Sequence, residues 1–308
     1  MDEISKVLRS QGIVMNTLVF QQWHNQCAYY LLDQKKMLKI SKLVLDGHMR
    51  QRRVHAISHV PKIYATATIT VSEETYHYLI TDYVQGDDLW HIIRALTEEQ
   101  KYNVGKEIAQ FLIELHQIKG SAYDMGHYIP TIPTYKDSWK NGHVEYVEIL
   151  KNSLGKLDLE LDSKHIVSEA FDYIYENINV LEYQMGAKLL HNDFHPKNMI
   201  IDNGKLSGVI DWECSQFGEA DFELVHLFHW CIYPSVPDND LELVVKGVID
   251  HLPFFSEIPN IEKRLTIYQL EHELNQIVWN GKNQEAERVQ RISGWLDGRI
   301  DALLAKWC

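Results

Sequence analysis

The sequence of 308 residues has few cysteines and no long apolar run. Its four cysteines are far apart and form no CxxC pair, so we expect no disulfide scaffold and a cytoplasmic protein. No apolar stretch is long enough to span a bilayer, which argues against a membrane protein. The N-terminus has no basic segment followed by an apolar one, and this argues against a secretory signal.

Positive charge is also scarce. The chain has 30 Lys and Arg against 43 Asp and Glu, which gives a formal net charge of −13. A nucleic acid or an anionic membrane would require a basic face, so we expect neither as a partner. A small cationic ligand is compatible with this balance, although acidity can also serve solubility alone.

Two kinds of periodicity divide the chain. Up to residue 84, β-branched and aromatic runs alternate with polar turns and predict strands, whereas apolar residues recur at helical spacing further on. Thr97 and Gln100 fit a capping box at the start of one such helix. We therefore expect an α+β protein with a β-rich domain at 1–84 and a mainly helical domain at 85–308. Strands are expected at 17–22, 28–32, 37–40, 62–71 and 76–84, and helices at 50–59, 97–116, 165–181, 261–279 and 286–306.

The segment 190–213 contains polar residues that suit phosphoryl transfer. Asp193 and Asn198 fit the pattern H-x-D-x-x-x-x-N, and Asp211 ends an apolar strand further on. A carboxylate such as Asp193 can orient an attacking hydroxyl and accept its proton. The amide oxygen of Asn198 and the carboxylate of Asp211 are ligands that Mg²⁺ prefers.

A tight turn is expected inside this segment. Asn203-Gly204 is a strong signal for a two-residue hairpin turn, which would bring Asn198 and Asp211 to the same end of a hairpin. The segment as a whole predicts an Mg²⁺-dependent phosphotransferase, or kinase, that uses an alcohol group as acceptor. A chance grouping of polar residues in a loop is the alternative.

Several motifs resemble those of the aminoglycoside phosphotransferase and choline kinase superfamily, whose members are relatives of protein kinases. HNDFHPKN at 191–198 is similar to the family's H-x-D-x-H-x-x-N, and VIDWE at 209–213 to its I-D-[WF]-[EG] strand. GEADFEL at 218–224 is similar to G-D-P-x-x-D-L, with Glu223 at the second acid. The resemblance implies a bilobal protein-kinase-like fold, Mg²⁺ as cofactor, and ATP or GTP as phosphate donor.

The same resemblance implies roles for the catalytic segment. Asp193 would be the catalytic acid/base, while Asn198 and Asp211 would hold the metal. His191 would fix the catalytic loop by hydrogen bonds. His195 would either contact the substrates or support the loop.

The expected nucleotide site departs from the family pattern. Lys39, on the third expected strand, would reach the α- and β-phosphates, and the stretch that contains Asp82 and Val84 would bind the purine. However, the loop 21–27 has no glycine, and Asn25 and His24 could donate to the phosphates in place of glycine amides. No glutamate follows Lys39 in the position that would hold it.

The acceptor site is the least defined. Acidic residues and an aromatic surface in the helical domain could bind an amine by charge and by cation–π contact. His226 and His229 share a helix face with Glu223, but without HExxH we expect a helix-face role and no metal. The tentative acceptor-binding residues are Glu213, Glu219, Glu271, Glu273 and Trp279.

Three functions remain open at this point. The first is phosphorylation of an aminoglycoside, which would confer antibiotic resistance. The second is a metabolic kinase of choline, ethanolamine, a sugar or another amino alcohol. The third is a nucleotide-binding pseudokinase without activity, which the missing glycine and glutamate suggest.

Overall fold

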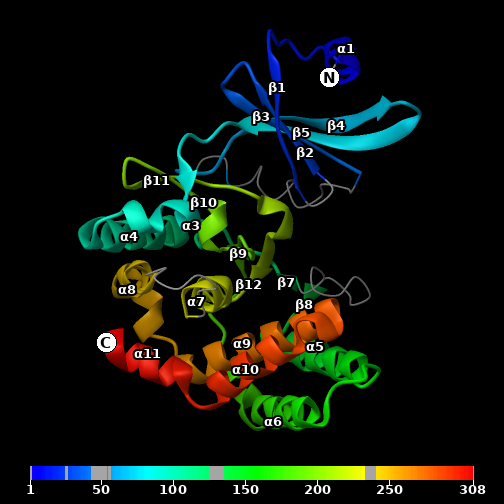
Figure 1. The fold of residues 1–308 in the computed structure, drawn as a ribbon. Coiled ribbons are helices and arrows are strands. Elements are labelled where there is room, and N and C mark those ends of the chain that lie inside the picture. The colour runs from blue at the N-terminus through cyan, green and yellow to red at the C-terminus, as the bar shows by residue number, and fades with distance from the viewer. Residues whose placement is uncertain are drawn as a thin grey trace. The chain divides into compact units, whose positions relative to one another are not determined.

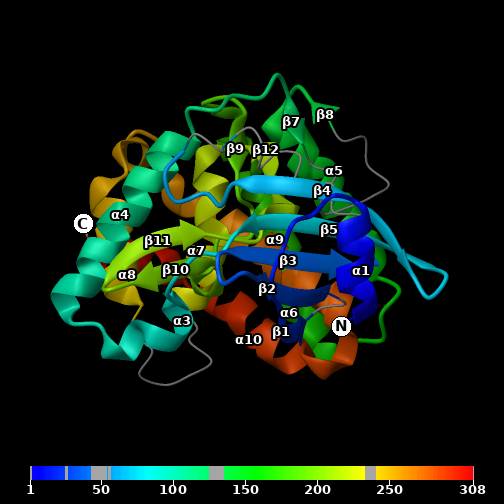
Figure 2. The same cartoon turned by 90° about the horizontal axis from the view of Figure 1, so that it is seen from above.

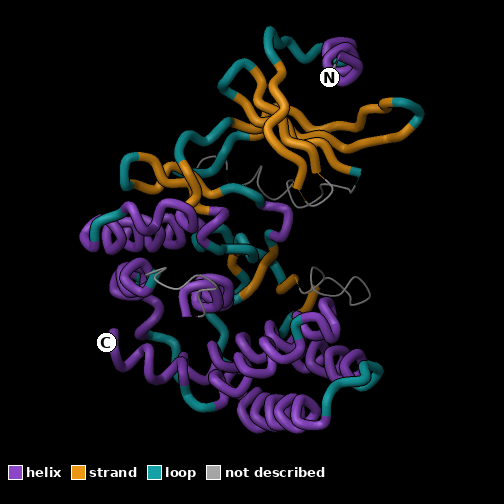
Figure 3. Tube along the Cα trace, viewed as in Figure 1, coloured by secondary structure: helices purple, strands orange, loops and turns teal. Residues whose placement is uncertain are grey.

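The computed structural model describes residues 2–24, 27–42, 54, 57–124, 135–232 and 241–307. The chain forms two compact units. One combines Met1–His91 with Lys197–Ser215, and the other combines Ile92–Pro196 with Gln216–Cys308. The first is rich in strands and the second in helices, which confirms the expected α+β class (Figures 1 and 3).

The first unit contains a five-stranded antiparallel sheet in the order β1-β2-β3-β5-β4. All five strands expected from the sequence are present, displaced by at most a few residues. Ser72 and Glu73 connect β4 to β5 with φ of 49° and 69°, the left-handed geometry of a two-residue hairpin turn. The strands are β1 Leu18–His24, β2 Cys27–Leu32, β3 Lys36–Ser41, β4 Ile63–Val71 and β5 Glu74–Asp82.

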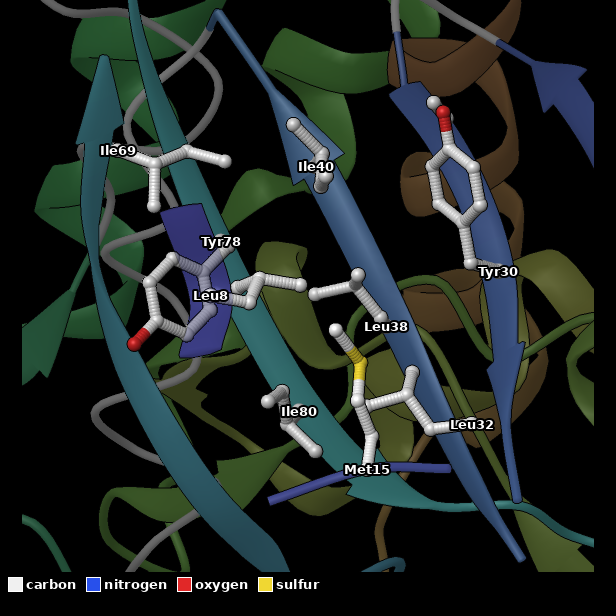
Figure 4. Close-up of a cluster of buried hydrophobic side chains, with 10 residues drawn as sticks. Leu8, Met15, Tyr30, Leu32, Leu38, Ile40, Ile69, Tyr78 and Ile80 are labelled. Atoms are coloured by element: carbon white, nitrogen blue, oxygen red, sulfur yellow. The ribbon is translucent and has the colours of Figure 1, made fainter. Parts of the chain in front are cut away.

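Helix α1, Asp2–Ser10, covers one face of this sheet (Figure 2). Leu8 of the helix is completely buried among side chains from the strands, including Leu38 and Ile80 (Figure 4). Full burial of each such side chain contributes roughly 2 kcal/mol to stability. The cluster therefore fixes the sheet from the side on which α1 lies.

A second, smaller sheet belongs to the same unit and contains most of the expected catalytic hairpin. Strands β10, Met199–Asp202, and β11, Lys205–Val209, pair antiparallel, and β10 also pairs with β6, Asp87–Asp88. A Cβ at Gly86 would lie 2.2 Å from the Ile201 carbonyl oxygen, so β6 can approach only with glycine there. Because of this pairing, 197–215 groups with the first 91 residues, whereas the sequence analysis divided the chain at 84.

The hairpin turn has the expected geometry. Asn203 and Gly204 have φ of 50° and 75°, as a type I′ turn requires. The helix expected at 50–59 lies mostly outside the described residues. Its last residues, 57–59, form a turn in which His59 has φ of 66°.

The second unit is built mainly from helices. Thr97 and Gln100 form the predicted capping box at the start of α4. Helix α4 crosses α8 closely, since a Cβ at Gly105 would lie 2.1 Å from the Val244 carbonyl oxygen. The helices are α3 Leu89–Ile92, α4 Glu98–Leu115, α5 Trp139–Leu154, α6 Leu161–Asn177, α7 Leu224–Ile232, α8 Glu242–His251, α9 Ile261–Asn280, α10 Glu285–Leu296 and α11 Arg299–Trp307.

The expectation of one helix over 286–306 was wrong. The structure has two helices there, α10 and α11, because Gly298 takes φ of 79° and ends the first. Short strands pair β9, Lys188–Leu190, with β12, Gln216–Gly218, and β7, Tyr123–Asp124, with β8, Tyr135–Lys136. Among the described residues, none of the helices combines the length and apolarity that a membrane crossing requires.

Candidate functional site

A buried lysine and two acids meet in the first unit. Lys39 lies in the middle of β3, and its side chain is only 6% exposed. Its Nζ donates to Oδ1 of Asp211 at 3.0 Å and to Oε2 of Glu213. The sequence analysis predicted Lys39 and Asp211 for one site, and the structure joins them directly.

Burial would lower the pKa of Lys39, but the charges of Asp211, Tyr29 and Glu213 outweigh it and raise that pKa above its ordinary value. The lysine is thus held as a cation. A buried ammonium group beside carboxylates is suited to binding phosphate oxygens once those carboxylates are neutralised or displaced.

Asp211 lies at the open end of the β10–β11 hairpin, in a strained backbone conformation. Its φ of 65° and ψ of 60° are left-handed, which an aspartate tolerates better than most residues. The next residue, Trp212, is fully buried, and its Nε1 donates to the Val209 carbonyl at 2.9 Å. This anchor makes a short turn over Trp212–Cys214, so that Asp211 and Glu213 both reach Lys39.

The hairpin also brings Asn198 next to this turn. The backbone N–H of Ile210 donates to the Asn198 carbonyl at 3.0 Å, directly before β10 begins. Asn198 is buried, while the Asp211 side chain is 31% exposed. The Asn198 amide and the Asp211 carboxylate are chemically suited to hold Mg²⁺, which prefers oxygen ligands.

The loop after β9, which contains the predicted catalytic residue Asp193, belongs to the second unit. Glu223, which is buried, accepts from the backbone N–H groups of His191 at 2.7 Å and Asn192 at 2.9 Å. Asn192 has φ of 62°, so the chain turns sharply before Asp193. The carboxylate of Glu223 thus holds the loop by two charge-assisted bonds.

His191 supports the same turn from inside. It is fully buried, and its Nδ1 accepts from the backbone N–H of Asp193 at 3.3 Å. The hydrogen-bonding role that the resemblance implied for His191 is compatible with this contact. The sequence analysis considered Glu223 as a family position and as a neighbour of His226 and His229, and its two bonds to the loop were not foreseen.

Asp193 is accompanied by histidines. Nε2 of His195 lies 3.5 Å from Oδ1 of Asp193, and the His195 ring stacks on Trp230 of α7 with centroids 5.0 Å apart. Burial would raise the pKa of Asp193. The hydrogen bond from His195 and the charges of His226, His195 and His191 outweigh burial and hold that pKa below its usual range. Asp193 is therefore kept ionised, as a proton acceptor requires.

The residues expected to bind the purine are engaged as follows. The carboxylate of Asp82 accepts from the N–H of Lys62 at 2.9 Å and from the hydroxyl of Tyr64 at 2.7 Å. The Val84 side chain packs over Gly208, where an added Cβ would lie 2.7 Å away. Asn25 lies outside the described residues, so the role expected for it stays a prediction.

The carboxylates proposed for acceptor binding have partners within the protein and do not form one group. In the second unit, Glu219 accepts from the Tyr123 hydroxyl, and Oε2 of Glu271 lies 2.7 Å from Nδ1 of His143. Trp279 is 73% exposed at the end of α9. Glu213 belongs to the other unit and binds Lys39. Acceptor binding by these residues remains a prediction.

The remaining acid, Glu273, belongs to a cluster of charged groups and histidines between α7, α9 and α10. It lies 3.0 Å from Nδ1 of His229 and accepts from Arg288 at 3.0 Å. His272 packs against His229 with ring centroids 4.5 Å apart. Burial, assisted by nearby cations and histidines, lowers the pKa of both His229 and His272 well below the ordinary value.

Comparison with known proteins gives a match over most of the chain. The model of the family described as "Phosphotransferase enzyme family" matches residues 45–242, a span that contains Asp193, Asn198 and Asp211. A hygromycin-B 4-O-kinase of Escherichia coli is 40% identical over 42 residues. That match covers 14% of this chain and 12% of the kinase, so it spans only a small part of the relative.

Solved structures show the same fold. A thermostable mutant of aminoglycoside phosphotransferase APH(4)-Ia, in ternary complex with AMP-PNP and hygromycin B, superposes with a TM-score of 0.71 at 17% identity, covering 96% of this chain and 98% of that one. ADP-bound APH(2'')-Ib gives 0.63 at 22% identity, covering 98% of both chains. The GDP complex of a mutant aminoglycoside 2'-phosphotransferase-IIIa gives 0.68 at 14% identity, covering 97% of this chain and 98% of that one.

Proposed function

Because the chain belongs to the phosphotransferase enzyme family, we propose that it transfers the γ-phosphate of ATP or GTP to a hydroxyl of an aminoglycoside-like cationic acceptor. The membership itself confirms the resemblance and the class of enzyme predicted from the sequence. The nucleotide, the metal and the acceptor belong to the proposal.

The observation that carries the proposal is the meeting of Lys39 with Asp211 at the hairpin end beside Asn198. One unit thus contains a cation that would bind phosphate and two side chains that would supply oxygen ligands to a metal. Bound Mg²⁺ would neutralise the phosphate oxygens, with Asn198 and Asp211 as its protein ligands. Lys39 would then bind the α- and β-phosphates.

Asp193 would act on the acceptor. The acceptor oxygen forms a bond to the γ-phosphorus as the bond from that phosphorus to the bridging oxygen breaks. The hydroxyl proton passes to the Asp193 carboxylate, and the nucleoside diphosphate leaves with the electron pair. The ionised state of Asp193 supports this role, because only the carboxylate can accept a proton.

Two features support a cationic acceptor. The formal net charge of −13 attracts cations in general. One solved structure with the same fold is an aminoglycoside phosphotransferase in complex with AMP-PNP and hygromycin B, and another is an aminoglycoside phosphotransferase with bound ADP. ATP and GTP both remain donors in the proposal, since similar folds are known with adenine and guanine nucleotides.

The test is a substrate screen. The full chain is incubated with Mg²⁺ and either ATP or GTP against aminoglycosides, macrolides, choline and ethanolamine, and acceptor-dependent release of nucleoside diphosphate is measured. We expect turnover with an aminoglycoside, and a loss of about 100-fold or more in Asp193→Ala. Asp202→Asn, at the turn of the β10–β11 hairpin, is the matched control and should retain activity.

Other outcomes would assign a different function. Turnover with choline or ethanolamine alone would establish the metabolic kinase instead. Tight nucleotide binding without turnover on any acceptor would establish the pseudokinase.

A further inference from the structure

The sequence gives Lys39 no glutamate in the segment where the kinase pattern would have one. Along the sequence, only one acidic residue, Asp46, lies between Lys39 and the hairpin tip at Glu73. A lysine on the third strand of a kinase-like sheet normally requires a glutamate to keep it directed at the phosphates. Some other group must therefore hold Lys39 while a nucleotide is bound.

Two acids contact Lys39 in the structure, and only one of them is available for this purpose. Asp211 binds Lys39 at 3.0 Å, but it is also the carboxylate placed to ligate the metal. Glu213 binds the same Nζ and has no such second assignment in the proposed chemistry. We infer that Glu213 is the positioning residue of Lys39, which holds the lysine towards the nucleotide phosphates when Asp211 turns to the metal.

The local backbone makes this assignment possible. Asp211 takes a left-handed conformation, and buried Trp212 ties the following turn to the Val209 carbonyl at 2.9 Å. Glu213 therefore comes from the same anchored turn as Asp211. A single short segment would supply both the metal ligand and the counter-charge of the lysine, in place of a glutamate from a separate helix.

The exposed fractions of the Glu213 and Lys39 side chains agree with this assignment. The Glu213 side chain is 42% exposed, whereas the Lys39 side chain is 6% exposed. The buried Lys39 side chain has little room to move, whereas the more exposed Glu213 carboxylate can adjust to the position of Nζ. A hydrogen bond between charged groups of this kind is worth about a tenfold change in binding.

The inference rests on the proposed function and differs from the acceptor-binding role considered for Glu213 above. Binding of ADP in the presence of Mg²⁺ is measured by calorimetry for the full chain, for Glu213→Gln and for Glu213→Asp. Kinetic constants for nucleotide and acceptor are then measured with Mg²⁺. Glu74→Gln is the matched control, because Glu74 forms an exposed ion pair with Lys42 at 2.8 Å in the same sheet.

We expect Glu213→Gln to weaken ADP binding and to raise the KM for nucleotide by about tenfold. The KM for the acceptor should stay unchanged, Glu213→Asp should recover part of the loss, and Glu74→Gln should behave as the unmodified chain. A raised acceptor KM with unchanged ADP binding would overturn the inference and make Glu213 an acceptor-binding residue. Unchanged constants throughout would overturn it as well.

The two proposals can fail separately. If no acceptor is phosphorylated but ADP binds, the proposed function fails, and the calorimetry still decides the role of Glu213. If the chain binds no nucleotide at all, both are overturned. Glu213→Asp keeps the comparison decisive should Glu213→Gln not fold.

Discussion

The two acids at the centre of the proposed chemistry are held in opposite ways. Asp211 sits in an ion pair with Lys39, on a turn with left-handed backbone. Asp193 sits on a loop that the buried carboxylate of Glu223 fixes through two backbone amides. The first arrangement consists of side-chain charges that ligands can replace, and the second consists of backbone hydrogen bonds that no ligand needs to break.

This difference indicates which side chains would have to rearrange during the proposed reaction. In the proposed chemistry, Asp211 exchanges its ion pair with Lys39 for the metal, while Lys39 keeps Glu213 and gains the phosphates. The Asp193 loop is already in place before any substrate arrives. Variants at the Lys39–Asp211 ion pair should therefore alter ligand binding and turnover while the fold stays intact. Variants of the residues that hold the Asp193 loop should alter stability as well.

The largest effect is expected for Asp211→Asn. Asparagine tolerates the left-handed backbone at this position, so the fold should survive, which alanine would not test as cleanly. Loss of the carboxylate should lower Mg²⁺-dependent turnover by about 1000-fold, or roughly 4 kcal/mol. The measurement is kcat with saturating nucleotide, together with a thermal unfolding curve.

Asp202→Asn provides the control for this variant, because it removes a carboxylate from the turn of the same hairpin. It should leave kcat unchanged. Full activity in Asp211→Asn would contradict the metal assignment.

The second largest effect is expected for Glu223→Gln, which changes the carboxylate that holds the Asp193 loop. Glutamine can accept from one of the two amides, but its own N–H₂ would face the other, so that one buried N–H loses its partner. We expect the free energy of unfolding to fall by about 3 kcal/mol, measured by urea denaturation. The exposed Glu176 of α6 gives the comparison, since Glu176→Gln should change stability by less than about 0.5 kcal/mol. Equal stabilities of the two variants would show that the loop does not depend on this carboxylate.

Much of the local structure around these two groups could be predicted from the sequence. The strands, the Asn203-Gly204 turn and the capping box at Thr97 depend on local chemistry, which short segments reveal without the rest of the chain. The family motifs were equally local, and the family match bears them out. The juxtaposition of Asn198 and Asp211 followed from the hairpin turn alone.

Side-chain contacts between residues far apart in the sequence could not be predicted in this way. The contact of Lys39 with Glu213 joins residues 174 positions apart, and nothing in either segment specifies it. The break between α10 and α11 was missed because the apolar spacing continues across Gly298, while the glycine acts through its backbone angle. Partners of Glu271 and Glu273 were missed for a similar reason, since helix periodicity gives a face but not its neighbour.

A smaller effect is expected for His195→Gln, and it concerns the charge state of Asp193. Burial raises the pKa of Asp193, and the His195 hydrogen bond and charge are among the groups that oppose it. Without His195 this pKa should rise, so that the acid limb of kcat/KM moves to higher pH. Turnover at pH 7 should fall by about tenfold at most. An unchanged pH profile with lower turnover would show that His195 merely supports the loop against Trp230.

The smallest effect belongs to the histidine cluster of the second unit, which lies outside the proposed chemistry. His229 and His272 have pKa values well below 6.5 in the folded chain, so the unfolded chain binds more protons below that pH. The stability they contribute is complete above about pH 6.5 and is lost as the pH falls, by up to about 1.4 kcal/mol per pH unit for each histidine. The positive charges of Arg288 and Arg291 beside His229 act in the same direction, whereas the charge of Glu273 opposes the shift at His272. Urea denaturation between pH 5 and 7 should show this dependence of the free energy of unfolding on pH. His272→Gln should reduce the slope by the amount that corresponds to about one proton taken up on unfolding. His165→Gln, at an exposed position of α6, is the control and should leave the slope unchanged. If His272→Gln kept the full slope, the cluster would not be the origin of the acid sensitivity.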